Sequence, residues 1–508
     1  MITDNTPIII GVGQYSERPQ DPGYAALSHM DLAGNALQNA IDDCDASGDV
    51  AGAIDALIAI RQFEISYAGA VVPFGKSNNP PRSIAQRVGA NPEIAILEIT
   101  GGQANQKMVG EVAERIAQCE YDMAAIVGSE AVSTVLSLLK QGEKPDWSEH
   151  IEGEMDDRGF GPERIFHSVW RHHGTKGVIG GYACVDNARR AQLGLSLDEY
   201  RYRVGELFAP FTQVAAANPH AAAPVKRTAV ELATVTERNR IVAEPYTRMT
   251  VARDQVNQGA AIILSSVGKA KQLGIPQDRW VYLHACTTAD ELKIERRPDL
   301  ARSPASIASL EGALEHSDKR MSDMAYLDFY SCFAAPVFNA MDHFGIAADD
   351  PRGLTLTGGL PFFGGAGNNY SAHAIAEAVQ KVRSDRGSFA LVGANGGVMS
   401  KYATGIYSTE PASWNEQVRY DRMSVPQKPE PFTLDPQGIS TVETYTWADD
   451  GNKVSGTVVV RDADMRRAVI RPDVEDVATR ELFEGGEPFG ATLVIKRDDR
   501  GRNIARLA

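Results

Sequence analysis

The chain has 508 residues, of which 43% are hydrophobic and 23% charged, the balance of a folded protein with a large core. This length exceeds one compact core, so two to four domains are expected. A formal net charge of -15 argues against nucleic-acid binding, because phosphate contacts require clustered lysines and arginines.

No stretch has the roughly 18 uncharged apolar residues of a membrane span. The start, MITDNTPIIIGVGQYSERP, lacks the basic segment of a signal or transit peptide. The cysteines are odd in number and never spaced as CxxC, which predicts a cytoplasmic protein without a metal site. They are Cys44, Cys119, Cys184, Cys286 and Cys332.

Short aliphatic runs alternate with longer amphipathic segments, which predicts an α/β protein with mostly buried strands. Strands are expected at PIIIGVG from Pro7, DALIAI from Asp55, DMAAIVGSEAV from Asp122, QGAAIILSSVG from Gln258, WVYLHACTTA from Trp280, MAYLDFYSCFA from Met324 and SFALVGANGG from Ser388. Helices are expected at QANQKMVGEVAERIAQ from Gln103 and SAHAIAEAVQKV from Ser371.

One pattern occurs twice. LEITGGQANQKMVGEVAERIAQ from Leu97 and LTLTGGLPFFGGAGNNYSAHAIAEAVQKV from Leu354 both run from an apolar strand through Thr-Gly-Gly into a helix. Two similar halves predict a duplicated α/β unit, although two ordinary βαβ units can also agree by coincidence. The glycine-rich loop of the second copy does not have the spacing of a phosphate-binding loop, because no third glycine and no GK[ST] follow.

Composition changes twice more along the chain. Residues 135–245 are polar at first and then helical, which is typical of an inserted lid or ligand-binding subdomain. Beyond the proline-rich linker VPQKPEPFTLDP, short alternating strands with an Asp-Asp-Gly turn predict a small β-barrel over residues 425–508.

The duplicated halves, the insertion, the run NQGAAIILSS and the GANGG strand together resemble the thiolase superfamily over essentially the whole chain. Within it, the sterol-carrier-type thiolases and the type 1 thiolase-like proteins with an added C-terminal domain are the most similar. The resemblance implies the thiolase fold, with two βαβαβαββ halves in α-β-α-β-α layers. The halves are then residues 1–134 plus 246–270, and residues 271–410, with an OB-like barrel at the C-terminus.

Three catalytic positions of thiolases depart from that pattern. The nucleophilic cysteine, whose pKa a helix N-terminus lowers, corresponds to Gly102. The histidine of the second glycine-rich loop corresponds to Gly365, and the second cysteine to Ala394. Weak or absent thiolase activity is therefore expected, because the covalent intermediate and its activating base are both missing.

The YSCF segment resembles the remaining thiolase motif, NEAF or HDCF. It places Tyr330 at the Asn or His position and Phe333 on the pantetheine path. The resemblance extends to thiolase-like aldolases, which carry a tyrosine there, so Tyr330 is a candidate general acid or base, or else a core tyrosine. Cys332 is a candidate nucleophile if strand alternation turns it to the same face.

Weaker candidates complete the predicted site. His373 is a candidate catalytic group at the start of a helix, Asn368 a candidate hydrogen-bond donor, and His167 a candidate contact for a CoA phosphate. The backbone N–H groups of four glycines can form an oxyanion hole. They are Gly101, Gly102, Gly396 and Gly397.

Two functions remain open from the sequence. One is an acyl-CoA carbon–carbon bond enzyme, either an acyltransferase resembling acetyl-CoA acetyltransferase or a retro-aldol lyase, in lipid metabolism. The other is a non-catalytic carrier of CoA or lipid-acyl groups. In both, coenzyme A or an acyl-CoA is the ligand without a permanently bound cofactor, and a monomer is favoured over a homodimer.

Overall fold

The computed structural model describes residues 2–161, 167–175, 177–414, 417–436, 438–449 and 454–508. Over these residues, no helix is both long enough and apolar enough to span a bilayer. Eleven strands form one sheet in the order β10-β11-β12-β9-β1-β8-β4-β2-β3-β5, with β13 beside β9. Their bounds are β1 Pro7–Ser16, β2 Ala56–Ile60, β3 Ile94–Glu98, β4 Met123–Ala131, β5 Asp156–Asp157, β8 Asn257–Ser266, β9 Val281–Asp290, β10 Tyr326–Phe329, β11 Phe389–Gly396, β12 Lys401–Ser408 and β13 Tyr420–Met423.

The duplication predicted from the sequence is visible in the strand order. The first half runs β1-β8-β4-β2-β3, and the second repeats it as β9-β12-β11-β10. The residues after Leu354, which correspond to β3, run beside β10 without forming a full strand: Phe329 N donates to Leu354 O over 3.1 Å. The halves meet where β1 and β9 pair antiparallel at Ile8 and Ile9.

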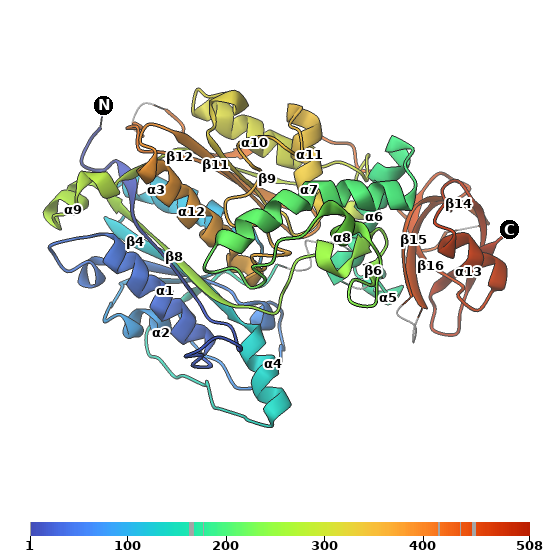
Figure 1. Cartoon of the computed structure of the whole chain (residues 1–508), viewed down its shortest axis with the longest axis horizontal. Coiled ribbons are helices and arrows are strands. Elements are labelled where there is room, and N and C mark those ends of the chain that lie inside the picture. Colours follow the sequence, from blue (N-terminus) through green and yellow to red (C-terminus); the bar gives the residue numbers. More distant parts are fainter. Residues whose placement is uncertain (1, 162–166, 176, 415–416, 437, 450–453) are drawn as a thin grey trace.

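The two halves of the sheet are two layers, and helices between them and on both outer faces make up the other three (Figure 1). The central pair, α3 and α12, contacts strands of both halves, which explains why both helices are buried along much of their length. In the view of Figure 1, α10 and α11 cover one outer face at the top, and α1 and α2 cover the other at the bottom. The bounds are α1 His29–Asp43, α2 Pro80–Arg87, α3 Ala104–Ala117, α4 Val132–Gln141, α9 Val267–Gln272, α10 Pro304–His316, α11 Ala334–Phe344 and α12 Tyr370–Ser384. This is the expected α-β-α-β-α thiolase fold.

One strand is shorter than expected. The apolar run from Met324 forms β10 only as far as Phe329, and α11 begins at Ala334. Residues 330–333 therefore lie in a connection at the carboxyl end of a parallel strand, the edge at which open α/β sheets bind ligands.

The inserted segment is mainly helical and supports the C-terminal barrel. It consists of α5 Val169–His172, α6 Gly177–Leu193, α7 Leu197–Ala217, α8 Ala229–Ala233, β6 Ile241–Ala243 and β7 Tyr246–Thr247. The barrel closes in the order β14-β15-β16-β18-β17 and lies at the right-hand end of Figure 1. Its elements are β14 Ile439–Asp449, β15 Val454–Arg461, β16 Arg467–Pro472, α13 Val477–Glu484, β17 Thr492–Arg497 and β18 Asn503–Leu507. The predicted Asp-Asp-Gly turn at 449–451 extends outside the described residues.

Helix α6 joins the barrel to the rest of the molecule. Arg190, fully buried, donates to Gly486 O over 2.7 Å and pairs with Glu487. Asn187 Nδ2 donates to Tyr445 O in β14 over 2.9 Å. The barrel is thus docked on the inserted segment by buried polar contacts.

The outer edge of β3 is bordered by β5 of the same chain. Ile96 and Leu97 pair in parallel with Asp156 and Asp157. The next residue, Arg158, forms ion pairs with the buried carboxylate of Glu98 at 2.8 Å and with the carboxylate of Glu111 at 2.7 Å. An edge strand offers unpaired N–H and C=O groups to another chain, and here a segment of the chain itself occupies part of that edge.

Candidate active site

A cavity of about 870 Å³ lies where the two glycine-rich turns, the segment after β10 and the inserted segment meet. Its lining brings together most of the residues singled out from the sequence, although they are hundreds of positions apart. Those lining it are Gly101, Gly102, Tyr330, Cys332, Phe333, Gly365, Asn368, Gly396 and Gly397. The remainder of the wall is largely apolar, with Ile179, Val242, Met249, Val251 and Phe362 among its residues.

The space beside Gly102 is filled by Tyr330. A Cβ atom added to Gly102 would overlap the Tyr330 hydroxyl and would lie only 2.5 Å from the main-chain oxygen of Asn395. No real Cβ approaches atoms this closely, so a side chain at position 102 and the present Tyr330 exclude each other. The Tyr330 phenol thus occupies the space that the side chain of a nucleophile at position 102 would need.

The Tyr330 hydroxyl has no hydrogen-bond partner in the part of the chain that the structure describes. Its ring packs edge-on against Tyr370, with centroids 5.2 Å apart. Burial raises the pKa of Tyr330 well above its usual range, and the nearby Cys332 adds to the rise. Tyr330 is therefore a neutral phenol at physiological pH, able to donate a hydrogen bond to a ligand but not to act as a phenolate base.

Cys332 also lines the cavity, in a polar cluster with Tyr182 and Asn395. Asn395 Nδ2 lies 3.8 Å from Cys332 Sγ and donates to the Tyr182 hydroxyl over 2.6 Å. Burial raises the pKa of the Cys332 thiol to about 12. A thiol with this pKa is almost entirely protonated at neutral pH, which makes it a poor nucleophile as it stands.

Asn368 lines the cavity with its side chain already engaged. Its Oδ1 accepts from Gly101 N over 3.0 Å, and its Nδ2 donates to Arg61 O over 2.6 Å. Asn368 therefore holds the Thr-Gly-Gly turn in place, and the Gly101 N–H is used by this contact. Among the described residues, the N–H groups of Gly102 and Gly397 have no such partner, and because both residues line the cavity, these groups are candidate donors.

The outer part of the cavity is strongly basic. Five arginines of the inserted segment and its return to β8 line it, and most are exposed. Only Arg227 has an acidic partner among the described residues, Glu231 at 3.7 Å. Burial and the adjacent positive charge of Arg248 lower the pKa of Arg253, as expected for neighbouring cations. The five are Arg227, Arg238, Arg240, Arg248 and Arg253.

Three of the predicted positions do not line the cavity. His373 is fully buried on α12, where Nδ1 bonds Gln14 over 2.7 Å and burial lowers its pKa to about 3. His167 contacts Phe432 of the linker at 5.9 Å between ring centroids, and its Nδ1 accepts from Val169 N. Ala394 is buried within β11. These three residues are therefore outside the cavity lining, and their roles stay predictions.

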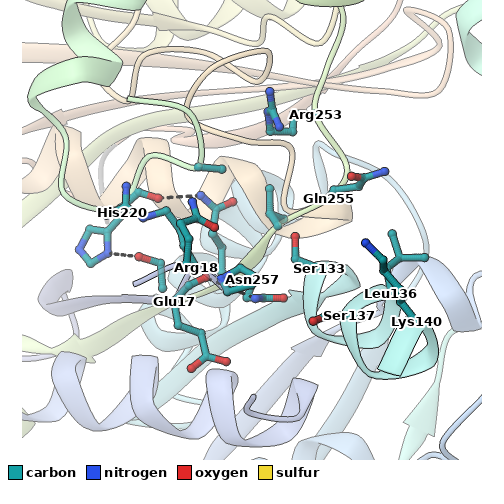
Figure 2. Close-up of a pocket in the computed structure, with 16 residues that line it drawn as sticks. Glu17, Arg18, Ser133, Leu136, Ser137, Lys140, His220, Arg253, Gln255 and Asn257 are labelled. Atoms are coloured by element: carbon teal, nitrogen blue, oxygen red, sulfur yellow. Dashed lines mark hydrogen bonds between the residues drawn. The ribbon is translucent and has the colours of Figure 1, made fainter. Parts of the chain in front are cut away.

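A second, polar hollow of about 300 Å³ adjoins the first and shares Arg253 and Gln255 with it. Figure 2 shows Leu136, Ser137 and Lys140 on one helix at its right, and His220 at its left. His220 Nδ1 lies 3.0 Å from the Ser16 hydroxyl. This hollow holds none of the residues predicted from the sequence. No group of three or more metal-ligating side chains is found anywhere in the described residues.

Two kinds of site residue were not predicted from the sequence. Tyr182 and Asn395 enter the site from α6 and from the end of β11, and single residues in buried segments have no pattern that marks them. The arginines were missed because the net charge of the whole chain is negative. RTAVELATVTERNR and YTRMTVARD nevertheless contain five of them between residues 227 and 253. A local charge count over the insertion would have found them.

Comparison with solved structures gives clear matches. A crystal structure of a monomeric SCP2-thiolase-like protein type 1 from Mycobacterium smegmatis is 40% identical over the whole of both chains, with a TM-score of 0.84. The Ltp2-ChsH2(DUF35) aldolase is 17% identical over 79% of this chain and 97% of that one, with a TM-score of 0.58. The dimeric peroxisomal thiolase of Saccharomyces cerevisiae is 14% identical over 81% and 99%, with a TM-score of 0.57. No family model and no curated protein matches the sequence.

Proposed function

Because this chain belongs to the thiolase superfamily, among the SCP2-thiolase-like proteins of type 1, we propose that it binds coenzyme A thioesters and cleaves or forms a carbon–carbon bond in them without an acyl-enzyme intermediate. The observation that carries the proposal is the Tyr330 hydroxyl, which has no hydrogen-bond partner among the described residues and lies where a nucleophile on residue 102 would lie.

The charge and shape of the cavity support a CoA thioester as ligand. A cavity of about 870 Å³ is in the size range of sites for cofactors and their substrates. The exposed arginines at its outer part suit the phosphates of coenzyme A, since one guanidinium group can donate two parallel hydrogen bonds to a phosphate. The apolar wall suits the pantetheine and acyl portions, which then lead inward to Tyr330 and Gly102.

The chemistry that fits a neutral phenol is retro-aldol cleavage of a β-hydroxyacyl-CoA, or its reverse. The bond between the α and β carbons breaks, the β carbon leaves as an aldehyde or ketone, and its hydroxyl proton is in net transferred to the α carbon. While the electron pair lies on the thioester as an enolate, the Tyr330 O–H and the Gly102 N–H donate hydrogen bonds to the enolate oxygen. This role replaces the general base expected for Tyr330, since a raised pKa favours the donor form.

Kinetics of Tyr330→Phe test this function. The phenylalanine keeps the ring packing against Tyr370 but removes the donor, so turnover of a β-hydroxyacyl-CoA should fall about 10²–10³-fold, while affinity for acyl-CoA stays nearly unchanged. Tyr326→Phe is the matched control, because Tyr326 bonds Asp385 away from the cavity and its change should leave the rate unaltered. Equal rates for wild type and Tyr330→Phe would contradict the proposed role.

A second candidate function is a carrier that binds acyl-CoA without turnover. The engaged side chain of Asn368 and the high pKa of the Cys332 thiol favour it, because both remove reactive groups from the cavity. Binding of CoA thioesters without cleavage of any β-hydroxyacyl-CoA or β-ketoacyl-CoA would favour this carrier over the enzyme.

We further propose that the chain is a monomer. The partly occupied outer edge of β3 supports this, as does the monomeric state of the Mycobacterium smegmatis protein that is 40% identical to it.

A further inference from the structure

We infer that Asn395 is a specificity-determining residue whose side-chain oxygen accepts a hydrogen bond from the β-hydroxyl of the acyl group. This inference rests on the proposed binding of CoA thioesters and adds the residue that distinguishes a β-hydroxylated acyl group from an unsubstituted one.

The orientation of the Asn395 amide follows from the hydrogen bonds of Tyr182. The Tyr182 hydroxyl donates its single proton to Gly397 O over 2.8 Å and accepts from Met399 N over 3.1 Å. Its remaining lone pair can only accept, so the Asn395 group 2.6 Å away must be the N–H₂ donor. The amide oxygen of Asn395 consequently points away from Tyr182.

That oxygen has no partner. Asn395 is 1% exposed and lines the cavity, yet its Oδ1 accepts no hydrogen bond within the described residues. A buried polar atom without a partner lowers stability by about 1–3 kcal/mol, so most are paired in native proteins. Because Asn395 belongs to a residue set that lines a ligand cavity, this need is explained if a bound ligand supplies the donor.

The position of Asn395 indicates which ligand group this is. Its main-chain oxygen and the Tyr330 hydroxyl both border the space beside Gly102, at the buried end of the cavity. The arginines that suit the phosphates lie at the exposed end, so the acyl group occupies the Gly102 end. There, Tyr330 requires an acceptor, which the thioester oxygen provides, and Asn395 requires a donor. A hydroxyl on the β carbon, two bonds from the thioester carbon, supplies that donor in the same ligand.

Other unpaired acceptors nearby do not substitute for Asn395. Thr100 Oγ1 is also unpartnered at the cavity wall, but a hydroxyl can donate as well as accept and so does not distinguish ligands. Gln103 Oε1 is unpartnered too, but the residue does not line the cavity. Asn395 therefore meets both conditions: it lines the cavity, and its unpaired oxygen can only accept a hydrogen bond.

The test is calorimetric titration of the full chain with 3-hydroxybutyryl-CoA and with butyryl-CoA, which differ only in the hydroxyl. Both titrations are repeated on Tyr330→Phe, so that cleavage adds no heat. We expect the hydroxylated ligand to bind on the order of tenfold more tightly. Asn395→Leu, which has the same branching and number of side-chain heavy atoms but no polar group, should remove that preference while still binding butyryl-CoA.

Asn339→Leu is the matched control, because Asn339 is a buried amide on α11 that bonds Ser303 O over 3.1 Å outside the cavity. It should retain the preference. Equal affinity of wild type for the two ligands overturns the inference while the proposed function stands, and this outcome does not depend on whether Asn395→Leu folds. A preference that persists in folded Asn395→Leu also overturns it. Failure of both ligands to bind wild type would overturn the proposed function together with the inference.

Discussion

At the scale of single residues, Gly102 and Tyr330 form one unit rather than two independent changes from the thiolase pattern. A cysteine cannot be restored at position 102 by one substitution, because its Cβ would overlap the Tyr330 hydroxyl. We expect Gly102→Cys to lower the free energy of unfolding by about 1–3 kcal/mol through overpacking and to show no thiolysis of acetoacetyl-CoA. Chemical denaturation and a thiolysis assay measure the two effects.

Gly365→Ala is the matched control for that variant. A Cβ at Gly365 would meet nothing closer than Arg253 O at 3.3 Å, so the alanine needs only a small adjustment of its neighbours. Stability close to that of wild type is expected. Gly102→Cys with wild-type stability, or with brisk thiolysis, would show that Tyr330 does not fill this space in solution.

Glu130, at the end of β4, makes the stability of the protein depend on pH. Its Oε1 accepts from Phe63 N over 2.8 Å and touches Gly367, and both of these residues line the cavity. Burial raises the pKa of Glu130 to about 8, from 4.5. The folded chain therefore holds a proton that the unfolded chain releases, so this stabilisation is complete below about pH 4.5 and is lost as the pH rises through about 8.

We therefore expect Glu130→Gln to reduce the loss of stability between pH 5.5 and 8, because glutamine cannot ionise. A single proton contributes at most about 1.4 kcal/mol per pH unit to the free energy of unfolding. Melting temperatures of wild type and variant over this range measure the difference. Glu143→Gln, at an exposed position, serves as control, and identical pH profiles for Glu130→Gln and wild type would refute the role of Glu130.

The sequence could identify the residues of the site that lie in motifs. The resemblance of the glycine-rich turns and of YSCF to thiolase motifs led to Gly102, Gly365 and Tyr330, and expected strand alternation led to Cys332. It could not indicate the donor role that we propose for Tyr330, because the pKa depends on burial by distant segments. For the same reason, His373 was a candidate until the fold placed it against Gln14.

At the scale of secondary-structure elements, the outer edge of β3 depends on a segment of only two paired residues. Arg158 holds that segment by bonding Glu98 and Glu111 across the sheet edge. Arg158→Ala leaves the buried Glu98 with Lys107 as its remaining ion-pair partner. We expect a loss of roughly 1–3 kcal/mol in the free energy of unfolding, and faster amide exchange in β3.

Arg115→Ala removes a more exposed partner of the same Glu111, at 3.2 Å, and should have little effect on either measurement. Unchanged exchange in β3 of Arg158→Ala would mean that the segment at Asp156 is held by other contacts.

The order of the elements was predictable because hydrophobic periodicity and the repeat are local properties of the chain. The end of β10 at Phe329 and the pairing of β5 with β3 were not, because both depend on contacts between segments distant in sequence. A two-residue strand of aspartates has no apolar pattern to recognise.

At the scale of the whole molecule, the barrel is joined to the inserted segment by buried polar groups. Removing residues beyond Ser424 would expose Arg190 and Asn187, which bond the barrel in the intact chain. We expect the full chain to be monomeric by light scattering and the shortened chain to be less stable and prone to association. A dimer at full length would contradict the proposed monomer, and a shortened chain as stable as the full one would contradict the docking role of α6.

The cavity of this thiolase-like protein is proposed to bind coenzyme A thioesters. Calorimetric titration of the full chain with butyryl-CoA tests this binding, with Arg238→Ala/Arg240→Ala as the double variant, which removes two cations that have no acidic partner among the described residues. Binding with a micromolar dissociation constant, weakened about tenfold or more in the double variant, is the predicted result. The absence of any heat or thermal shift for wild type would contradict the claim.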